Sequence, residues 1–221
     1  MDVIGVLTLG QTPRPDFERI FRRAIPEAKL LVRGALDGLS VDEIDGLAAG
    51  AGDYPLFTIL RDGTTREIDL RRLKPLLDER ARQVAAQGAS ISALMCAGDF
   101  PDLASPIPVL YPSRVLTAVA RGVCRGRSVG VVTPNAGQVA PATAHWQRAG
   151  FEPSVAVASP LDPAALSAVT AVFAAKKLEL IVLDCLGFPP ETARHVRAAA
   201  GCPVLCPQGL LPRILAEMLG A

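Results

Sequence analysis

The 221-residue sequence predicts an α/β protein built from two homologous halves, each containing a parallel β-sheet. Short, continuous apolar runs alternate with longer helical stretches, which is typical of parallel strands covered on both faces. Three segments then recur in the same order along the chain, which indicates two halves related by a pseudo-twofold axis. No long Gly/Ser linker separates the halves. We therefore expect them to pack closely, with a cleft between them.

The predicted buried strands are short runs rich in Val, Ile and Leu. They cover residues 3–7, 91–95, 129–132, 178–183 and 204–205. The recurring segments contain these runs. Residues 4–8 (IGVLT) match 129–133 (VGVVT), residues 93–101 (ALMCAGDFP) match 182–189 (VLDCLGFP), and residues 108–112 (PVLYP) match 203–207 (PVLCP).

The predicted helices carry start and stop signals. A helix opening at Pro75 and running to Gln87 would place Gly88 at the position where helices favour glycine. Asp162-Pro163 is an N-cap followed by proline, which predicts a helix through about Lys176. Pro189-Pro190 precedes another helix that ends near Gly201.

The first half holds extra residues between about positions 34 and 75. Within them, Arg61-Asp62-Gly63-Thr64 separates two β-prone runs, and Asp-Gly in that setting predicts a β-hairpin. This insertion is the part of the chain that we expect to serve as a lid, if the site has one.

Composition excludes several classes of function. The 23 basic and 22 acidic residues nearly cancel, and aromatic residues are 5% of the chain, so we expect neither nucleic acid nor a membrane as partner. No apolar run reaches the length of a membrane span, and the N-terminus lacks the pattern of a signal peptide, so we expect a cytoplasmic location. Nucleotide-binding motifs are absent, and two histidines make a metal site unlikely by composition.

Five cysteines, an odd number, argue against a disulfide framework in such a chain. Cys96 and Cys185 occupy matched positions in the repeat, each after a buried strand and before a glycine-containing loop. In parallel α/β sheets ligands bind at the carboxyl ends of strands. The two thiols therefore suit proton transfer on opposite faces of one carbon, one as thiolate base and the other as thiol acid. Cysteines are also commonly buried and inert, which is our reading of Cys124, Cys202 and Cys206.

Candidate substrate-binding groups lie beside these strand ends. Loop amides can hold a carboxylate, an arginine can bind it with two hydrogen bonds, and the threonine hydroxyls end the matched first strands. Arg14 is equally well explained as a solvated helix residue, and Arg61 by its hairpin turn. The candidates are Thr8, Gln11, Arg14, Arg61, Ala97, Gly98, Thr133, Leu186 and Gly187.

Two acids flank the cysteines unequally. Asp99 follows Cys96 by three residues, and Asp184 directly precedes Cys185. Because side chains alternate along a strand, Asp184 should point away from Cys185, and we expect a structural role for it. His145-Trp146 lies on a predicted helix without a partner at useful spacing, so we expect a surface or interface role there.

Several stretches resemble the AroM family, within the aspartate/glutamate/hydantoin racemase superfamily. They are residues 4–15 (IGVLTLGQTPRP), 34–44 (GALDGLSVDEI), 60–63 (LRDG), 95–101 (MCAGDFP) and 182–188 (VLDCLGF). The resemblance implies two flavodoxin-like halves, a site in the cleft, no cofactor, and a cysteine pair that transfers protons next to a carboxylate or carbonyl. Superfamily members often follow each cysteine with Asn or Thr, whereas this chain has Ala97-Gly98 and Leu186-Gly187.

The resemblance also implies a domain division and an assembly. We expect a first half over residues 1–111, a second half over 112–206, and a C-terminal segment, 207–221, that packs on the first half. A homodimer is compatible with the family.

The sequence therefore predicts a cofactor-independent racemase or epimerase for a small amino acid or derivative, with Cys96 and Cys185 as the acid/base pair. Two alternatives stay open. One is an isomerase or decarboxylase of small carboxylic acids that uses a single nucleophilic cysteine. The other is a non-catalytic sensor of small carboxylates built on the same scaffold.

Overall fold

The computed structural model describes residues 2–221, and these divide into two compact units. The first unit comprises the chain up to Cys96, Phe100–Tyr111 and Leu211–Ala221. The second unit comprises Ala97–Asp99 and Pro112–Leu210. Over residues 2–221 we find no helix with the length and apolar character needed to cross a membrane.

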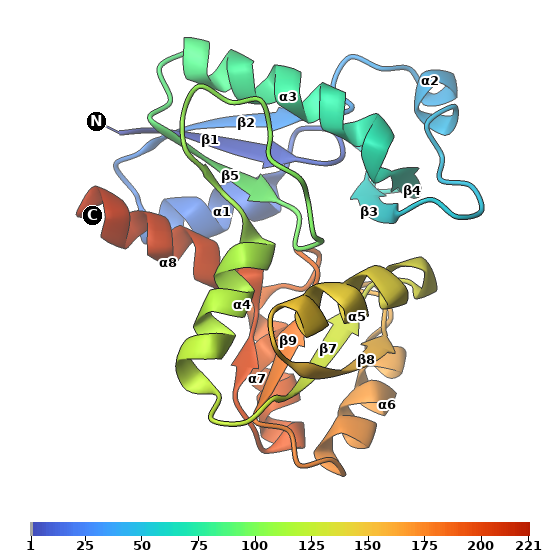
Figure 1. Cartoon of the computed structure of the whole chain (residues 1–221). Helices are drawn as coiled ribbons and strands as arrows, with labels where there is room; N and C mark the ends of the chain where they lie inside the picture. The colour runs from blue at the N-terminus through green and yellow to red at the C-terminus, as the bar shows by residue number, and fades with distance from the viewer. Residues whose placement is uncertain (1) are drawn as a thin grey trace. The chain divides into compact units, whose positions relative to one another are not determined.

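The first unit contains a four-stranded parallel sheet in the order β2-β1-β5-β6. Its strands are β1 (Val3–Thr8), β2 (Lys29–Gly34), β5 (Ile91–Met95) and β6 (Val109–Leu110). Helices α1 (Pro15–Ala24) and α3 (Leu70–Ala86) lie on opposite faces of this sheet (Figure 1). Burial on both faces explains why the central strands β1 and β5 read as continuous apolar runs rather than alternating ones.

Helix α3 begins five residues before the predicted start at Pro75. Its N-cap is Asp69, whose side chain accepts a hydrogen bond from the Arg71 amide, 3.4 Å away. Pro75 therefore lies inside the helix, on its exposed side. The predicted end is confirmed, because Gly88 follows the helix with a φ of +92° that favours glycine.

The insertion of the first half forms a separate two-stranded antiparallel sheet, as the hairpin signal predicted. Its strands are β3 (Pro55–Ile59) and β4 (Thr65–Asp69), and the turn contains Gly63 with a φ of +84°. A short helix, α2 (Val41–Asp45), precedes the hairpin and was not predicted. Ser40 caps it, and the Ser40 and Glu43 side chains each bond the other residue's amide.

The second unit repeats the order of the first sheet, with strands β10-β9-β7-β8, all parallel. The strands are β7 (Ser128–Thr133), β8 (Glu152–Val157), β9 (Leu180–Leu183) and β10 (Val204–Leu205). In each sheet the strand that comes second in its half lies at one edge, and the third and fourth lie beyond the first. The three recurring segments thus fall on equivalent strands, which confirms two flavodoxin-like halves.

The helices of the second unit are α4 (Pro112–Val123), α5 (Val139–Arg148), which follows the one-turn 3₁₀ helix η1 (Ala136–Gln138), α6 (Pro163–Ala174) and α7 (Pro190–Ala200). Two of them, α6 and α7, begin and end near their predicted signals. The Asp162 side chain caps α6 by accepting from the Ala165 amide at 2.9 Å. Gly201 ends α7 in the left-handed region. Helix α8 (Pro207–Leu219) begins in the second unit, and its residues from Leu211 onward belong to the first.

Candidate active site

Both matched cysteines lie at the carboxyl ends of central strands. Cys96 directly follows β5, and Cys185 lies two residues beyond the end of β9. In each sheet the strand beside the cysteine's strand, β1 or β7, is followed in sequence by a strand on its other side, β2 or β8. The strand order therefore reverses beside each cysteine, and such switch points are where α/β sheets bind ligands.

The Cys185 sulfur accepts a hydrogen bond from the backbone amide of Gly187 at 3.3 Å. A side chain at Gly187 would crowd this turn, because a Cβ atom there would lie 2.6 Å from the Pro160 ring. The carbonyl oxygen of Leu186 accepts a hydrogen bond from the buried side chain of Gln208 at 2.9 Å. An amide N–H directed at sulfur stabilises a thiolate, so this turn favours the ionised form of Cys185.

Cys96 is buried at the end of β5, and the residues that follow it are held by other contacts than those after Cys185. The three residues after it, Ala97–Asp99, belong to the second unit, and Phe100 returns to the first. The Asp99 carboxylate contacts Arg148 at 2.5 Å and the Nδ1 atom of His145 at 3.3 Å. Both partners lie on α5. The turn after Cys96 is therefore anchored by an acid at its far end.

The other three cysteines have the character of structural thiols. Burial raises the pKa of Cys206 to about 11, and its Sγ donates to the Phe188 carbonyl at 3.3 Å. Burial also raises the pKa of Cys124 and of Cys202. All three thiols are therefore protonated near neutral pH, which makes them poor nucleophiles and bases.

The loop after β1 is fastened to the insertion by its own polar groups. The Gln11 side chain accepts from the Arg61 amide at 3.1 Å and donates to the Leu36 carbonyl at 3.4 Å. Arg61 in turn donates from Nε to the Thr12 carbonyl at 3.1 Å. Asp37 accepts from both the amide and the hydroxyl of Thr12, at 2.7 and 2.9 Å. Sequence reasoning missed Asp37, whose only signal was a polar residue just after a buried strand.

Arg14 is buried and engaged within its own unit. Its guanidinium binds the Asp16 carboxylate at 2.6 and 2.9 Å and donates to the Thr8 hydroxyl at 3.1 Å. It also lies over the Phe17 ring, 3.7 Å from the centroid. Thr8 and Thr133, the matched threonines, are both fully buried, and Thr133 donates to the Asn135 and Ala156 carbonyls at 3.3 and 3.4 Å. Arg14 can therefore meet a substrate carboxylate only beside, or in exchange for, Asp16.

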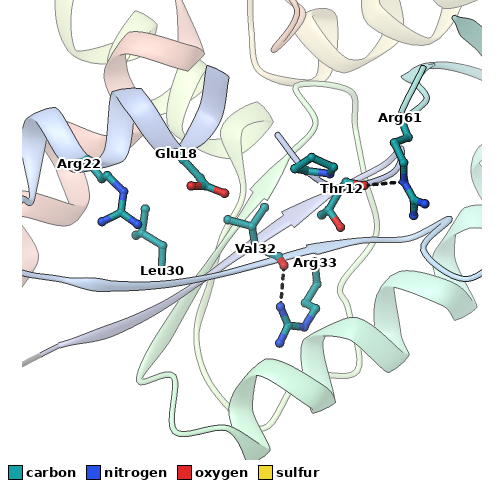
Figure 2. A pocket seen from close by; sticks show the side chains of 8 residues that line it. Thr12, Glu18, Arg22, Leu30, Val32, Arg33 and Arg61 are labelled. Atoms are coloured by element: carbon teal, nitrogen blue, oxygen red, sulfur yellow. Dashed lines mark hydrogen bonds between the residues drawn. The ribbon is translucent and has the colours of Figure 1, made fainter. Parts of the chain in front are cut away.

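Arg61 also lines an open groove of about 570 Å³ in the first unit. Figure 2 shows Arg22, Arg33 and Arg61 spread along this groove, which follows β2, an edge strand of its sheet. Arg33 donates to the Val32 carbonyl at 2.8 Å, so it occupies an acceptor on the open edge. Charged side chains at an edge discourage pairing with other chains. Edge protection therefore accounts for Arg33.

Asp184, the residue before Cys185, is buried. Burial raises the pKa of Asp184 to about 7; the Trp146 indole N–H opposes that shift, and the negative charge of Asp99 adds to it. The indole nitrogen falls short of regular hydrogen-bond geometry with any described residue. Trp146 is 1% exposed, so the predicted surface role for it is wrong. Helix α5 packs on β7 and β8. The sequence pattern alone did not show that Trp146 lies on the face of the helix that makes this contact.

Of the residues that sequence reasoning missed, Gln208 lies nearest a candidate cysteine loop. The repeat could have pointed to Gln208, because Gln208 directly follows Pro207, the last residue of the third recurring segment. It is buried and supports the loop after Cys185 through the Leu186 carbonyl.

The comparisons with known proteins place this geometry in a family. The model of the family described as AroM protein matches residues 4–219. No curated protein matches the chain. Among solved structures, the chain is similar to allantoin racemase from Klebsiella pneumoniae, with a TM-score of 0.67 and 16% identity, covering 100% of this chain and 88% of that one.

Two further structures show the same likeness. Glutamate racemase from Thermus thermophilus, in complex with beta-chloro-D-alanine, has a TM-score of 0.63 and 21% identity, with 99% of this chain and 80% of that one covered. An arylmalonate decarboxylase without ligand has a TM-score of 0.60 and 16% identity, with 97% and 92% covered. At these identities the likeness shows the fold.

Proposed function

The chain belongs to the AroM family and has the fold of the racemase superfamily, and from that premise we propose that it catalyses cofactor-independent proton transfer at a carbon next to a carboxylate or carbonyl. The substrate class that we propose is a small amino acid or amino-acid derivative. Cys96 and Cys185 are the acid/base pair of this proposal. The product is the opposite stereoisomer.

One observation carries the proposal: both cysteines follow equivalent central strands of two sheets with the same order. Duplication places each thiol at the switch point of its own sheet. Three other cysteines of the chain have raised pKa values, so they do not compete for the role. A duplicated thiol suits a reaction that needs two like groups, one as acid and one as base.

The proton balance is simple. One cysteine, as thiolate, removes the proton from the carbon, and the electron pair delocalises into the neighbouring carboxylate or carbonyl. The other cysteine, as thiol, delivers its proton to the opposite face of the carbon. The first ends as thiol and the second as thiolate, so the roles are exchanged for the reverse direction.

The substrate carboxylate needs hydrogen-bond donors from the protein. The amides of the two loops, Ala97-Gly98 and Leu186-Gly187, are the groups that we propose for it, because amide donors serve developing negative charge without a side chain. Gly187 already donates to the Cys185 sulfur. Arg14 and Arg61 hold their own loops in place and are secondary candidates.

The test is loss of the carbon-bound proton in deuterium oxide, followed by proton NMR. The panel contains amino acids of both hands, hydantoins, short dicarboxylates and arylmalonates. We expect exchange with at least one compound, and its loss in both Cys96→Ala and Cys185→Ala. Cys202→Ala, which removes a partly buried thiol outside the repeat match, is the matched control and should keep full activity. Exchange that survives in either active-site variant contradicts the two-base proposal.

The structural likeness to arylmalonate decarboxylase favours one alternative, a decarboxylase or isomerase with one essential cysteine. A single essential thiol could be Cys185, whose sulfur accepts a hydrogen bond from the Gly187 amide. Carbon dioxide release or double-bond movement that needs one cysteine only would move the assignment to this class. Binding of a panel compound, seen as a thermal shift without any turnover, would instead indicate a sensor.

A further inference from the structure

The acids that flank the two cysteines both face helix α5. Asp99, three residues after Cys96, contacts His145 and Arg148. Asp184, one residue before Cys185, is buried next to the indole of Trp146. The two carboxyl groups are close enough for the charge of Asp99 to raise the pKa of Asp184. A single turn of α5 therefore serves the chain segments around both thiols.

Asp99 is held by two residues on one side of that helix turn. The contact to Arg148 is 2.5 Å and that to His145 Nδ1 is 3.3 Å. The Asp99 side chain is 39% exposed and Arg148 is 63% exposed, whereas His145 is only 15% exposed. The His145 contact is thus the sheltered one, and solvent screens the Arg148 contact more strongly.

The orientation of His145 supports this anchor. Its Nε2 atom is buried and has no hydrogen-bond partner among the described residues. The other ring nitrogen, Nδ1, lies 3.3 Å from Asp99 Oδ1, so the ring meets the loop through this atom.

The loop itself is short and buried. Ala97 and Gly98 are buried, and only three peptide units separate Cys96 from Asp99. Fixing one end of so short a segment restricts the backbone of all of it. Ala97–Asp99 belongs to the second unit, whereas Cys96 closes β5 of the first.

We propose that Asp99, held by His145 and Arg148, is a positioning residue for Cys96. It fixes the turn that begins at the thiol and supplies a nearby negative charge, and it does not touch the substrate. This inference rests on the proposed function in taking Cys96 as reactive, but it concerns the thiol's setting and can be tested without knowing the substrate.

The test measures alkylation of each cysteine by iodoacetamide across pH, with the modified peptides quantified by mass spectrometry. In Asp99→Asn the freed turn exposes Cys96, and loss of a negative charge lowers the thiol pKa. Both effects act in the same direction. We expect Cys96 to react about three- to tenfold faster than in the wild type, from the size of such loop and charge effects. Cys185 should change less than twofold.

A second variant keeps the inference testable if Asp99→Asn folds poorly. Arg148→Gln, at an exposed position, removes the shortest contact and leaves the carboxylate in place. It should also speed Cys96 alkylation, without lowering the thiol pKa. Asp45→Asn removes a carboxylate paired with Arg66 at 2.6 Å in the other unit and is the matched control. Asp99→Glu, which keeps the charge, should restore part of the wild-type behaviour.

The outcomes separate the two proposals. Equal alkylation of Cys96 in the wild type, Asp99→Asn and Arg148→Gln would overturn the positioning role, even if both cysteines prove essential for exchange. Selective change at Cys96 with no exchange on any substrate would uphold the positioning role while the proposed function fails. Where a substrate is found, Asp99→Asn should lower kcat several-fold and leave KM within twofold, because the residue acts on the thiol and not on binding.

Discussion

The two cysteine loops of this protein, residues 96–99 and 184–187, come from the same position in the repeat but are supported differently. After Cys96, the nearest acid is three residues on, half-exposed, and bound by Arg148. Beside Cys185, the acid is one residue before, is buried, and has its pKa raised to about 7. A Gly187 amide faces the Cys185 sulfur. Duplication thus preserved the place of the thiol and let its surroundings diverge.

This difference teaches that two equivalent positions need not be two equivalent acids and bases. A cofactor-free racemase works in both directions, but it can do so with thiols of unequal pKa. The predictions below test how far the two loops differ, in order of decreasing effect.

The largest effect should come from the cysteines themselves. Cys96→Ser and Cys185→Ser should each lower the exchange rate by about 10²- to 10⁴-fold, the usual worth of a general acid or base. The alcohol is far less acidic than the thiol, while the volume hardly changes. Exchange rates by NMR, on protein shown by circular dichroism to be folded, give the comparison. A tenfold difference between the two variants would mark the thiol that serves as base with that stereoisomer.

The buried acid beside Cys185 should make stability depend on pH. Its pKa rises from 3.8 unfolded to about 7 folded, so the folded protein holds this proton more tightly. Stability therefore falls as pH rises from about 4 to about 7 and levels off above. Asp184→Asn should remove this fall, a difference of up to roughly 4 kcal/mol at about 1.36 kcal/mol per pKa unit. Urea unfolding of both proteins at several pH values measures it.

The contrast with the other loop supplies the control for this prediction. Asp99→Asn should leave the pH dependence of stability close to that of the wild type. Its carboxylate is 39% exposed, and exposed pairs contribute less than about 1 kcal/mol. Parallel curves for the wild type and Asp184→Asn would show that the buried carboxyl is not the titrating group.

The turn after β1, at Gly10, should tolerate less change in its backbone than the turn after Cys185. At Gly10 a Cβ atom would lie 1.9 Å from the Ile59 carbonyl oxygen, which is backbone. At Gly187 it would lie 2.6 Å from a proline side chain. We expect Gly10→Ala to destabilise by about 3 kcal/mol and Gly187→Ala by about 1 kcal/mol, the range for overpacked sites. Thermal unfolding measures both.

Gly122→Ala is the control for this pair. A Cβ atom at Gly122, in α4, meets nothing within 4 Å, and alanine favours helix. Its stability should therefore rise slightly. If Gly187→Ala proves as damaging as Gly10→Ala, the two turns resist an added side chain equally and the predicted difference is wrong.

An effect smaller than that at Gly10 should come from the support behind the second loop. Gln208→Ala leaves the Leu186 carbonyl without its 2.9 Å donor, and an unsatisfied buried acceptor costs about 1–2 kcal/mol. We expect a loss of that size in thermal unfolding, together with faster alkylation of Cys185 but not of Cys96. Gln147→Ala, at an exposed position, should change neither.

Much of the fold follows from local patterns. Continuous apolar runs predicted β1, β5, β7, β9 and β10, and cap signals at Asp162, Gly88 and Gly201 predicted helix ends, because these depend on residues next to each other in sequence. The edge strands β2 and β8 were missed because they are only partly buried and carry polar residues. The repeat predicted the equal strand orders. The start of α3 was missed because Pro75 is a stronger local signal than Asp69, whose capping role depends on the hairpin that leads into the helix.

The sequence by itself determined that the protein has two like halves, that each carries one cysteine after a central strand, and that the family is AroM. Those features depend on periodicity and repetition, which neighbouring residues encode. Only the tertiary structure showed that Arg14 forms an ion pair with Asp16, that Trp146 is buried beside Asp184, and that residues of α5 bind Asp99. Such contacts join residues of different elements or depend on a local turn, and their energies depend on burial, which no single segment specifies.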